Sequence, residues 1–279
     1  MSLPLRLPRL RSGLRITVGL LVAPARQRRH RSLPFTGKEC NHVPLGPIYR
    51  RLLRYPLWRL ANLQAPYEEF YAHIVSERIK RRQNHDAIGI SARPLRAATE
   101  LLDIMVKHGM QPHHRFVDYG CGSLRLGKAV IEYLDPDKFY GLDVAQLFLD
   151  LGMESLGQTL IDQKRPVLRR IDPSALELVS KTGPDYIGSW HVCSKVPDRH
   201  LKRYFSSIIG LMAPQAQAFI QFPQTDRRKR QNHLNWTLSK GEFTEVARSV
   251  SPKVRAEFTE LIPRNSAGVT ETYAHLFYE

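Results

Sequence analysis

From residue 110 onward, apolar residues follow two different spacings. Short apolar runs predict five strands, and apolar positions three or four residues apart predict the helices between them. The expected strands span 115–119, 139–143, 166–171, 186–190 and 216–222. The expected helices include one that carries Leu126, Val130, Ile131 and Leu134 and another over 199–212. Strands and helices that alternate in this way favour a parallel sheet with helices on both faces.

The end of the chain departs from this alternation. Ser239 and Glu242 have the spacing of a capping box, which predicts the start of a short helix that runs to Val250. Two further apolar runs, 254–262 and 272–278, then follow with no helix between them. Strands joined by a loop tend to pair antiparallel. The pattern therefore predicts an α/β fold whose seven-stranded, mostly parallel sheet ends in an antiparallel C-terminal edge hairpin.

The first hundred residues differ from the rest. Seven prolines spread over 1–60 exclude long helices and central strands there, which indicates a basic arm or leader. Apolar residues at helical spacing from Tyr67 to Ile74, and again between Pro94 and Gly109, predict two helices. We therefore expect an arm at 1–60, a helical extension at 61–109 and the main domain at 110–279.

Net charge changes the expected partners. The chain has a formal charge of +16 and a pI near 10.0, which favours anionic partners such as nucleic acid. Residues 1–38 contain eight arginines and no acidic residue, so much of this excess belongs to the arm. The apolar run 16–25 has about half the length that a membrane span needs, so no transmembrane segment is expected. We expect a cytoplasmic protein, or an organelle-targeted one if residues 1–31 are a transit segment.

The cysteines exclude two kinds of small, stabilised domain. Cys40, Cys121 and Cys193 are an odd number, lie far apart and include no C-x-x-C pair. This argues against a disulfide framework and against a structural zinc site, and no metal site is expected.

Candidate chemistry concentrates in the segment from Phe116 to Gly127. It reads as a strand, a turn with Gly120 and Gly122, and the start of a helix, with Asp143 about 20 residues further on at the end of the next strand. Glycines let the backbone turn tightly and let a ligand approach it. An acid at that distance can accept hydrogen bonds from ribose hydroxyls. The alternative is a tight turn that binds nothing.

A dinucleotide is the nearest rival ligand. Pyrophosphate binding favours a third small residue in G-x-G-x-x-G, and this position is Arg125. Asp118, two residues before the first glycine, would repel a pyrophosphate but suits a cationic or amino-bearing ligand. These residues favour S-adenosylmethionine over NAD.

The stretch from Asp118 to Ser123 resembles motif I of the class I S-adenosylmethionine-dependent methyltransferases. Gly120 to Arg125 is similar to a bacterial subgroup with a GCGSLR-type motif, in which leucine replaces the commoner third glycine. The resemblance runs from about Leu95 to Glu279 and includes Asp143 and the segment 185–189. It implies a Rossmann-like fold, S-adenosyl-L-methionine as cofactor and methyl transfer.

The resemblance also implies roles for individual residues. Gly120 and Gly122 would pack against the methionine moiety, Asp118 would lie near its amino group, and Asp143 would hold the ribose. Asp172 would lie near the adenine edge, with an N-cap before Pro173 as an equal alternative. Further cofactor-binding positions are Tyr119, Cys121, Ser123, Val144, Ser189 and Trp190. Two departures from the family pattern are Leu124 and Lys195, the latter where relatives often have histidine.

Catalytic and acceptor residues are less defined. His191, just beyond the fourth strand, is the candidate general base, ahead of His200 and His275. Arg227, Arg228 and Arg230 follow the fifth strand and would bind an anionic substrate or form a solvated loop.

Three hypotheses on function stay open. The first is methyl transfer to a small molecule or glycan hydroxyl. The second is an RNA or protein methyltransferase that uses the basic arm, and the third is a non-catalytic binding protein. The segment Ser189-Trp190-His191-Val192 does not resemble the Asn/Asp-Pro-Pro-aromatic motif of enzymes that methylate exocyclic base amines. It also lacks the Pro-Cys nucleophile of cytosine-C5 methyltransferases.

Overall fold

The computed structural model describes residues 55–82, 96–232, 234–263 and 265–279. Residues 53–279 form one compact unit. The predicted arm up to residue 54, its apolar run 16–25 and the start of the second predicted helix lie outside the described residues. Among the helices that are described, none is long and apolar enough to cross a membrane.

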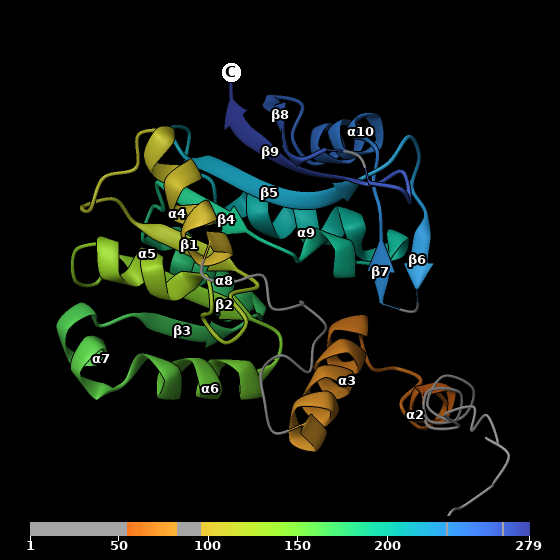
Figure 1. The fold of residues 1–279 in the computed structure, drawn as a ribbon, viewed down its shortest axis with the longest axis horizontal. Coiled ribbons are helices and arrows are strands. Elements are labelled where there is room, and N and C mark those ends of the chain that lie inside the picture. The colour runs from red at the N-terminus through yellow and green to blue at the C-terminus, as the bar shows by residue number, and fades with distance from the viewer. Residues whose placement is uncertain (1–54, 83–95, 233, 264) are drawn as a thin grey trace, which may run out of the picture. The chain divides into compact units, whose positions relative to one another are not determined.

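A seven-stranded sheet is the centre of this unit, in the order β3-β2-β1-β4-β5-β9-β8 (Figure 1). Its strands are β1 Phe116–Tyr119, β2 Phe139–Asp143, β3 Val167–Arg170, β4 Tyr186–Ser189, β5 Gln217–Gln224, β8 Val254–Ile262 and β9 Thr270–Tyr278. The first five are parallel, and β9 pairs antiparallel with both β5 and β8. The predicted fold class, including the antiparallel edge, is confirmed. The strand order reverses between β1 and β4, which is where ligands bind in such sheets.

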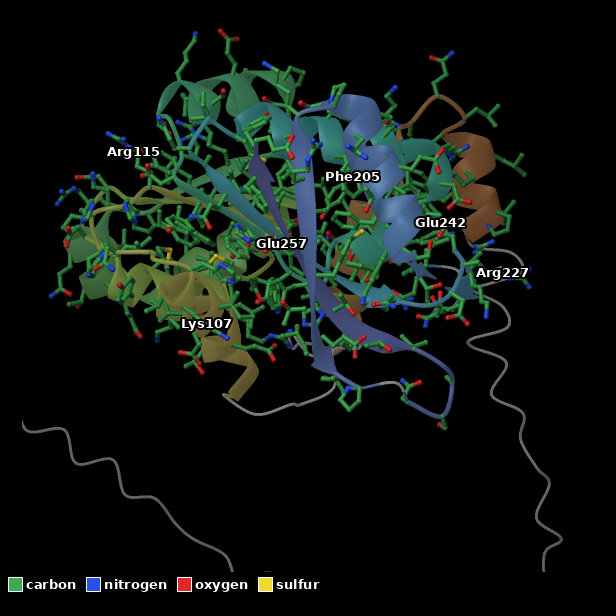
Figure 2. All side chains as sticks on the ribbon, turned by 90° about the horizontal axis from the view of Figure 1, so that it is seen from above. Lys107, Arg115, Phe205, Arg227, Glu242 and Glu257 are labelled. Carbon is green, nitrogen blue, oxygen red and sulfur yellow. The ribbon has the colours of Figure 1, made fainter. Side chains whose placement is uncertain are left out.

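Helices cover both faces of the sheet. One face carries α4 Arg96–Lys107, α5 Gly127–Tyr133 and α6 Gln146–Leu156, followed by α7 Gln158–Lys164. The other face carries α8 Pro173–Lys181, α9 Asp198–Leu211 and α10 Lys240–Val250. Successive strand residues point to opposite faces, so Phe116 packs in the first layer and Val117 in the second. Phe205 of α9 is fully buried in the second layer, whereas Arg227 lies exposed at its margin (Figure 2).

Two helices precede the sheet in sequence, α2 Tyr55–Ala61 and α3 Tyr67–Arg82. Val75 and Ile79 of α3 pack against Ala145 and Phe148 at the start of α6, which joins α3 to the carboxyl-end side of β2. Tyr71 of the predicted apolar face also packs against this cluster, whereas Val75 and Ile79 lie beyond the residues that predicted it.

Several short elements were not predicted: α2, α7, the 3-10 helix η3 Cys193–Lys195 and a hairpin of β6 Arg230–Asn232 with β7 Asn235–Trp236. Helix α6 ends at Leu156, before Gly157, which adopts φ 76°, and the chain then re-enters a helix as α7. Elements of two to seven residues are too short to show a hydrophobic period.

Candidate functional site

A cavity of about 620 Å³ lies at the carboxyl ends of β1 to β4. The strand ends and the glycine turn form one wall, and α3 and α9 form much of the rest. The predicted site residues in this wall are Asp118, Tyr119, Gly120, Cys121, Gly122, Ser123, Asp143, Val144, Asp172, Trp190 and His191. The structure thus brings together all the positions predicted for cofactor binding except Ser189, together with the candidate base.

The glycine turn uses its two glycines differently. Both have positive φ, 83° at Gly120 and 56° at Gly122, where glycine is favoured. A Cβ on Gly120 would lie 2.2 Å from Val192 Cγ2, whereas a Cβ on Gly122 would meet no atom within 4 Å. Gly120 therefore allows close packing of the turn against the β4 end, and Gly122 leaves open space beside the cavity.

Asp143 holds this turn in place. Its buried carboxylate accepts hydrogen bonds from Gly122 N through Oδ2 and from Ala145 N through Oδ1, both at 2.9 Å. Burial raises its pKa to about 6, and the backbone N–H groups oppose that rise. A carboxylate oxygen has two lone pairs, so Asp143 keeps acceptor capacity for ribose hydroxyls.

Asp118 is the buried carboxylate without a partner. It is 3% exposed, and within the described residues it forms no hydrogen bond or ion pair. Burial, together with the nearby charge of Asp143, raises its pKa to about 7. A buried carboxylate in this state is stabilised by a cationic partner.

Leu124, the first departure from the family pattern, adopts the left-handed conformation with φ 59° and is 1% exposed. A Cβ on Gly152 of α6 would lie 3.0 Å from Leu124 Cγ. The leucine side chain therefore fills space that a glycine in α6 leaves free. The backbone keeps a glycine-like shape although the residue is not glycine.

Asp172 caps helix α8. Its Oδ1 accepts hydrogen bonds of 2.8 Å from Ala175 N and from Ser174 Oγ, which lower its pKa. It also lines the cavity. The N-cap alternative is thus confirmed as a contact, and the adenine role stays a prediction.

At the end of β4, the Ser189 side chain points into the core, whereas the next two residues line the cavity. Ser189 Oγ is fully buried, donates to Tyr119 O at 3.0 Å and lies 2.7 Å from Tyr204 Oη, so its side chain ties β4 to β1 and α9. Trp190 and His191 line the cavity. His191 has φ 59°, and its backbone N–H donates to Gln221 Oε1 at 2.9 Å.

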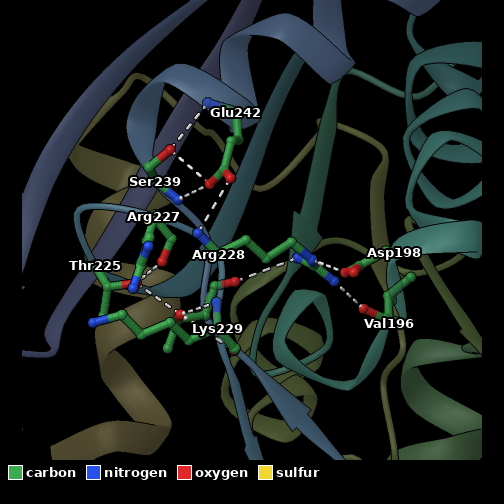
Figure 3. Close-up of polar contacts among 9 residues, drawn as sticks. Val196, Asp198, Thr225, Arg227, Arg228, Lys229, Ser239 and Glu242 are labelled. Atoms are coloured by element: carbon green, nitrogen blue, oxygen red, sulfur yellow. Dashed lines mark hydrogen bonds and ion pairs between the residues drawn. The ribbon is translucent and has the colours of Figure 1, made fainter.

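The three predicted substrate arginines lie away from the cavity wall. Arg228 forms an ion pair with Asp198 and donates to Val196 O at 2.7 Å, while its backbone N–H donates to Glu242 Oε1 at 3.2 Å (Figure 3). Arg230 lies over the Trp236 ring at 5.6 Å, and the Arg227 side chain is exposed. The contacts of Arg228 are thus with neighbouring parts of the protein. Substrate binding by Arg227, Arg228 and Arg230 stays a prediction.

Two further parts of the wall come from elements that the sequence patterns did not place beside the glycine turn. Tyr67, Glu68 and Tyr71 come from α3, and Lys195, His200 and Arg203 come from η3 and α9. Arg203 forms an ion pair with Glu68 at 3.5 Å, and His200 stacks on Tyr67, so the two parts contact each other. In this region the sequence singled out Lys195, as a departure from the family pattern, and His200, as a weaker candidate base. No cluster of three metal-ligating side chains occurs within the described ranges.

No protein-family model matches the chain, and no curated protein matches it in sequence. Solved structures do match it. Magnesium protoporphyrin IX methyltransferase from Synechocystis with bound SAM has a TM-score of 0.50 at 11% identity and covers 84% of this chain and 95% of its own. The methyltransferase domain of a bacterial Hen1 has a TM-score of 0.50 at 15% identity and covers 65% of this chain and 97% of its own. The [4+2]-cyclase SpnF has a TM-score of 0.60 at 11% identity and covers 77% of this chain and 97% of its own. The chain therefore has the Rossmann-like fold of these proteins.

Proposed function

We propose that the protein is an S-adenosylmethionine-dependent methyltransferase. The observation that carries this proposal is the cavity at the switch point, where Asp118 is buried without a partner beside the glycine turn. The α-amino group of the cofactor is the cation that this carboxylate lacks. The resemblance of Asp118–Ser123 to motif I supports the same ligand, and so does the methyltransferase with bound SAM that shares the fold.

The donor set fits this cofactor. Gly122 leaves room for the methionine moiety because a Cβ there would meet no neighbouring atom. Asp143 is placed to accept from ribose hydroxyls, and Asp172 would lie near the adenine. A pyrophosphate would meet two buried carboxylates, Asp118 and Asp143, which favours a ligand without phosphates.

When bound, the cofactor supplies a methyl group that is already activated as a sulfonium. The protein then has to position the acceptor and exclude water. Trp190 and His191, at the β4 end, line the part of the cavity next to the glycine turn. For a hydroxyl acceptor we assign His191 as the general base that takes its proton.

A small molecule or a glycan hydroxyl is the acceptor class that we favour. A cavity of about 620 Å³ falls in the range of small-molecule sites, and α3 and α9 wall it on the acceptor side. An RNA or protein acceptor would instead need the basic arm. A non-catalytic binding protein would show no affinity for the cofactor, or affinity without turnover.

The test is a thermal-shift titration with S-adenosylmethionine and S-adenosylhomocysteine, with NAD as the control ligand. A ligand at 100 times its dissociation constant stabilises the fold by about 2.7 kcal/mol. We expect this shift with both adenosyl ligands and not with NAD. Methyl transfer to acceptors is then measured with radiolabelled cofactor.

Two variants make the test specific. Asp118→Asn removes a charge without removing a hydrogen bond of the ligand-free protein, so the shift should be lost while the ligand-free fold remains. Asp162→Asn, on the exposed surface of α7, is the matched control. An unchanged shift in Asp118→Asn would contradict the proposed site, and no shift in the wild type would contradict the proposed function.

A further inference from the structure

Lys195 lies in the acceptor side of the cavity and has no role in the proposed function so far. It ends the 3-10 helix η3, six residues beyond the last residue of β4, and its side chain is half-buried in the cavity wall. Trp190 and His191, at the β4 end, line the same cavity. A charge at Lys195 therefore faces the compartment that an acceptor would enter.

The structure holds this lysine from outside the cavity. Lys195 Nζ donates to the side-chain oxygen of Asn235 in β7, and the β6–β7 hairpin packs against η3. Arg228, just before the hairpin, donates to Val196 O and forms an ion pair with Asp198, so it fixes the chain directly after Lys195 (Figure 3). The hairpin and Arg228 thus orient one cationic side chain.

No described carboxylate lies close enough to form an ion pair with this charge. Within the described residues Lys195 forms no ion pair, and its hydrogen-bond partner Asn235 is neutral. Burial and, to a smaller extent, the charge of Arg78 of α3 lower its pKa to about 8, while Glu271 of β9 opposes the change. The side chain remains mostly protonated at pH 7. Buried charges in proteins are normally paired, and an ammonium has three donors of which Asn235 accepts one.

We infer that Lys195 forms an anion subsite, so that the methyl acceptor carries a carboxylate or phosphate group that binds its ammonium. This inference rests on the proposed function, because it assigns the acceptor class to the same cavity. Arg203, the other Lys or Arg of η3 and α9 among the described lining residues, is already paired with Glu68, which leaves Lys195 as the cation of these two elements that an acceptor anion can bind. Aromatic side chains in the wall, among them Tyr67, Tyr71 and Trp190, suit an acceptor with an apolar or planar body.

The test uses probes of one shape and different charge on the full chain saturated with S-adenosylhomocysteine. Benzoate, phenyl phosphate and the neutral benzamide are titrated, and binding is followed by ligand-observed NMR. We expect the wild type to bind one or both anions at least about tenfold more tightly than benzamide, the factor that a charge-assisted hydrogen bond supplies. Which anion is preferred distinguishes a carboxylate from a phosphate. The preference should weaken as the pH rises from about 7 to about 9.5, because Lys195 loses its proton.

Lys195→Met should abolish the preference, and Lys202→Met, which removes an exposed lysine of α9, should preserve it. Equal binding of anions and benzamide by the wild type, or a preference that survives in Lys195→Met, would overturn the inference. The thermal shift with S-adenosylhomocysteine should be unchanged in Lys195→Met. A wild type that lacks this shift but prefers anions would contradict the proposed cofactor and leave the anion subsite standing.

Discussion

At the residue scale, Gly120 should matter mainly for stability and Gly122 mainly for ligand binding. Gly120→Ala places a methyl group 2.2 Å from Val192 Cγ2 in a backbone with φ 83°, so both overpacking and strain oppose it. We expect the free energy of unfolding to fall by roughly 2–4 kcal/mol. Gly122→Ala adds backbone strain but no overpacking, because no atom lies within 4 Å of the added carbon, so its free energy of unfolding should fall by only about 1 kcal/mol.

Gly122→Ala, the more stable of the two variants, should show the larger loss of ligand binding. The methyl group of Gly122→Ala enters the space beside the cavity, so its thermal shift with S-adenosylhomocysteine should be small although the variant is folded. Urea unfolding followed by circular dichroism gives the stability of each variant. If Gly122→Ala responds to the ligand as the wild type does, the methionine moiety does not pack against Gly122.

At the element scale, the loop after β5 is a clamp between three elements. Arg228 is 12% exposed and contacts Asp198 at the start of α9, Val196 beside η3 and Glu242 in the first turn of α10 (Figure 3). Arg228→Met keeps the aliphatic stem but leaves the Val196 carbonyl without its donor. We expect a loss of about 1–3 kcal/mol in the free energy of unfolding.

Arg227→Met is the matched control, because its side chain is exposed and the change should stay within about 0.5 kcal/mol. Denaturant unfolding of both variants measures the difference. Equal stability of the two variants would mean that the clamp does not hold and would return Arg228 to the candidates for substrate binding.

Elements with a local sequence pattern could be predicted, and elements without one could not. The capping box that Ser239 and Glu242 predicted is present in both directions, with Ser239 Oγ accepting from Glu242 N at 3.2 Å and Glu242 Oε2 accepting from Ser239 N at 2.9 Å. The β6–β7 hairpin has no such signal, because its two strands have three and two residues and β6 is exposed throughout. Its contact with η3, and not its own pattern, specifies it.

The same reasoning applies to the candidate site. The glycine turn and Asp143 were predictable because a motif and a spacing define them along the chain. Ser189 was not separable from Trp190, because every residue of β4 is buried and no alternation shows which side chain reaches the cavity. The α3 wall could not be predicted, since its contacts with α9 join residues more than a hundred positions apart.

At the scale of the whole molecule, most of the net charge lies outside the residues that form the described core. Residues 1–52 contain eleven lysines and arginines and one glutamate, so ten of the sixteen net positive charges lie there. The core clusters of the described residues draw on side chains from Val75 to Leu276. The cavity wall begins at Pro66. A protein that starts at Leu53 should therefore keep its free energy of unfolding within about 0.5 kcal/mol and keep its thermal shift with S-adenosylhomocysteine.

This truncation also decides between the acceptor classes. Binding to a polyanion such as single-stranded RNA should weaken strongly in the truncated protein, and its dependence on salt concentration should become shallower, because fewer counterions are released. If the acceptor is a small molecule, methyl transfer per folded protein stays unchanged while RNA binding falls, because the proposed acceptor contacts come from α3, η3 and α9. If methyl transfer falls in proportion to RNA binding, the arm delivers the acceptor and the enzyme acts on RNA. Measuring both quantities at two salt concentrations separates these outcomes, since arm-dependent transfer falls much more steeply with salt than transfer to an acceptor held by the half-buried Lys195.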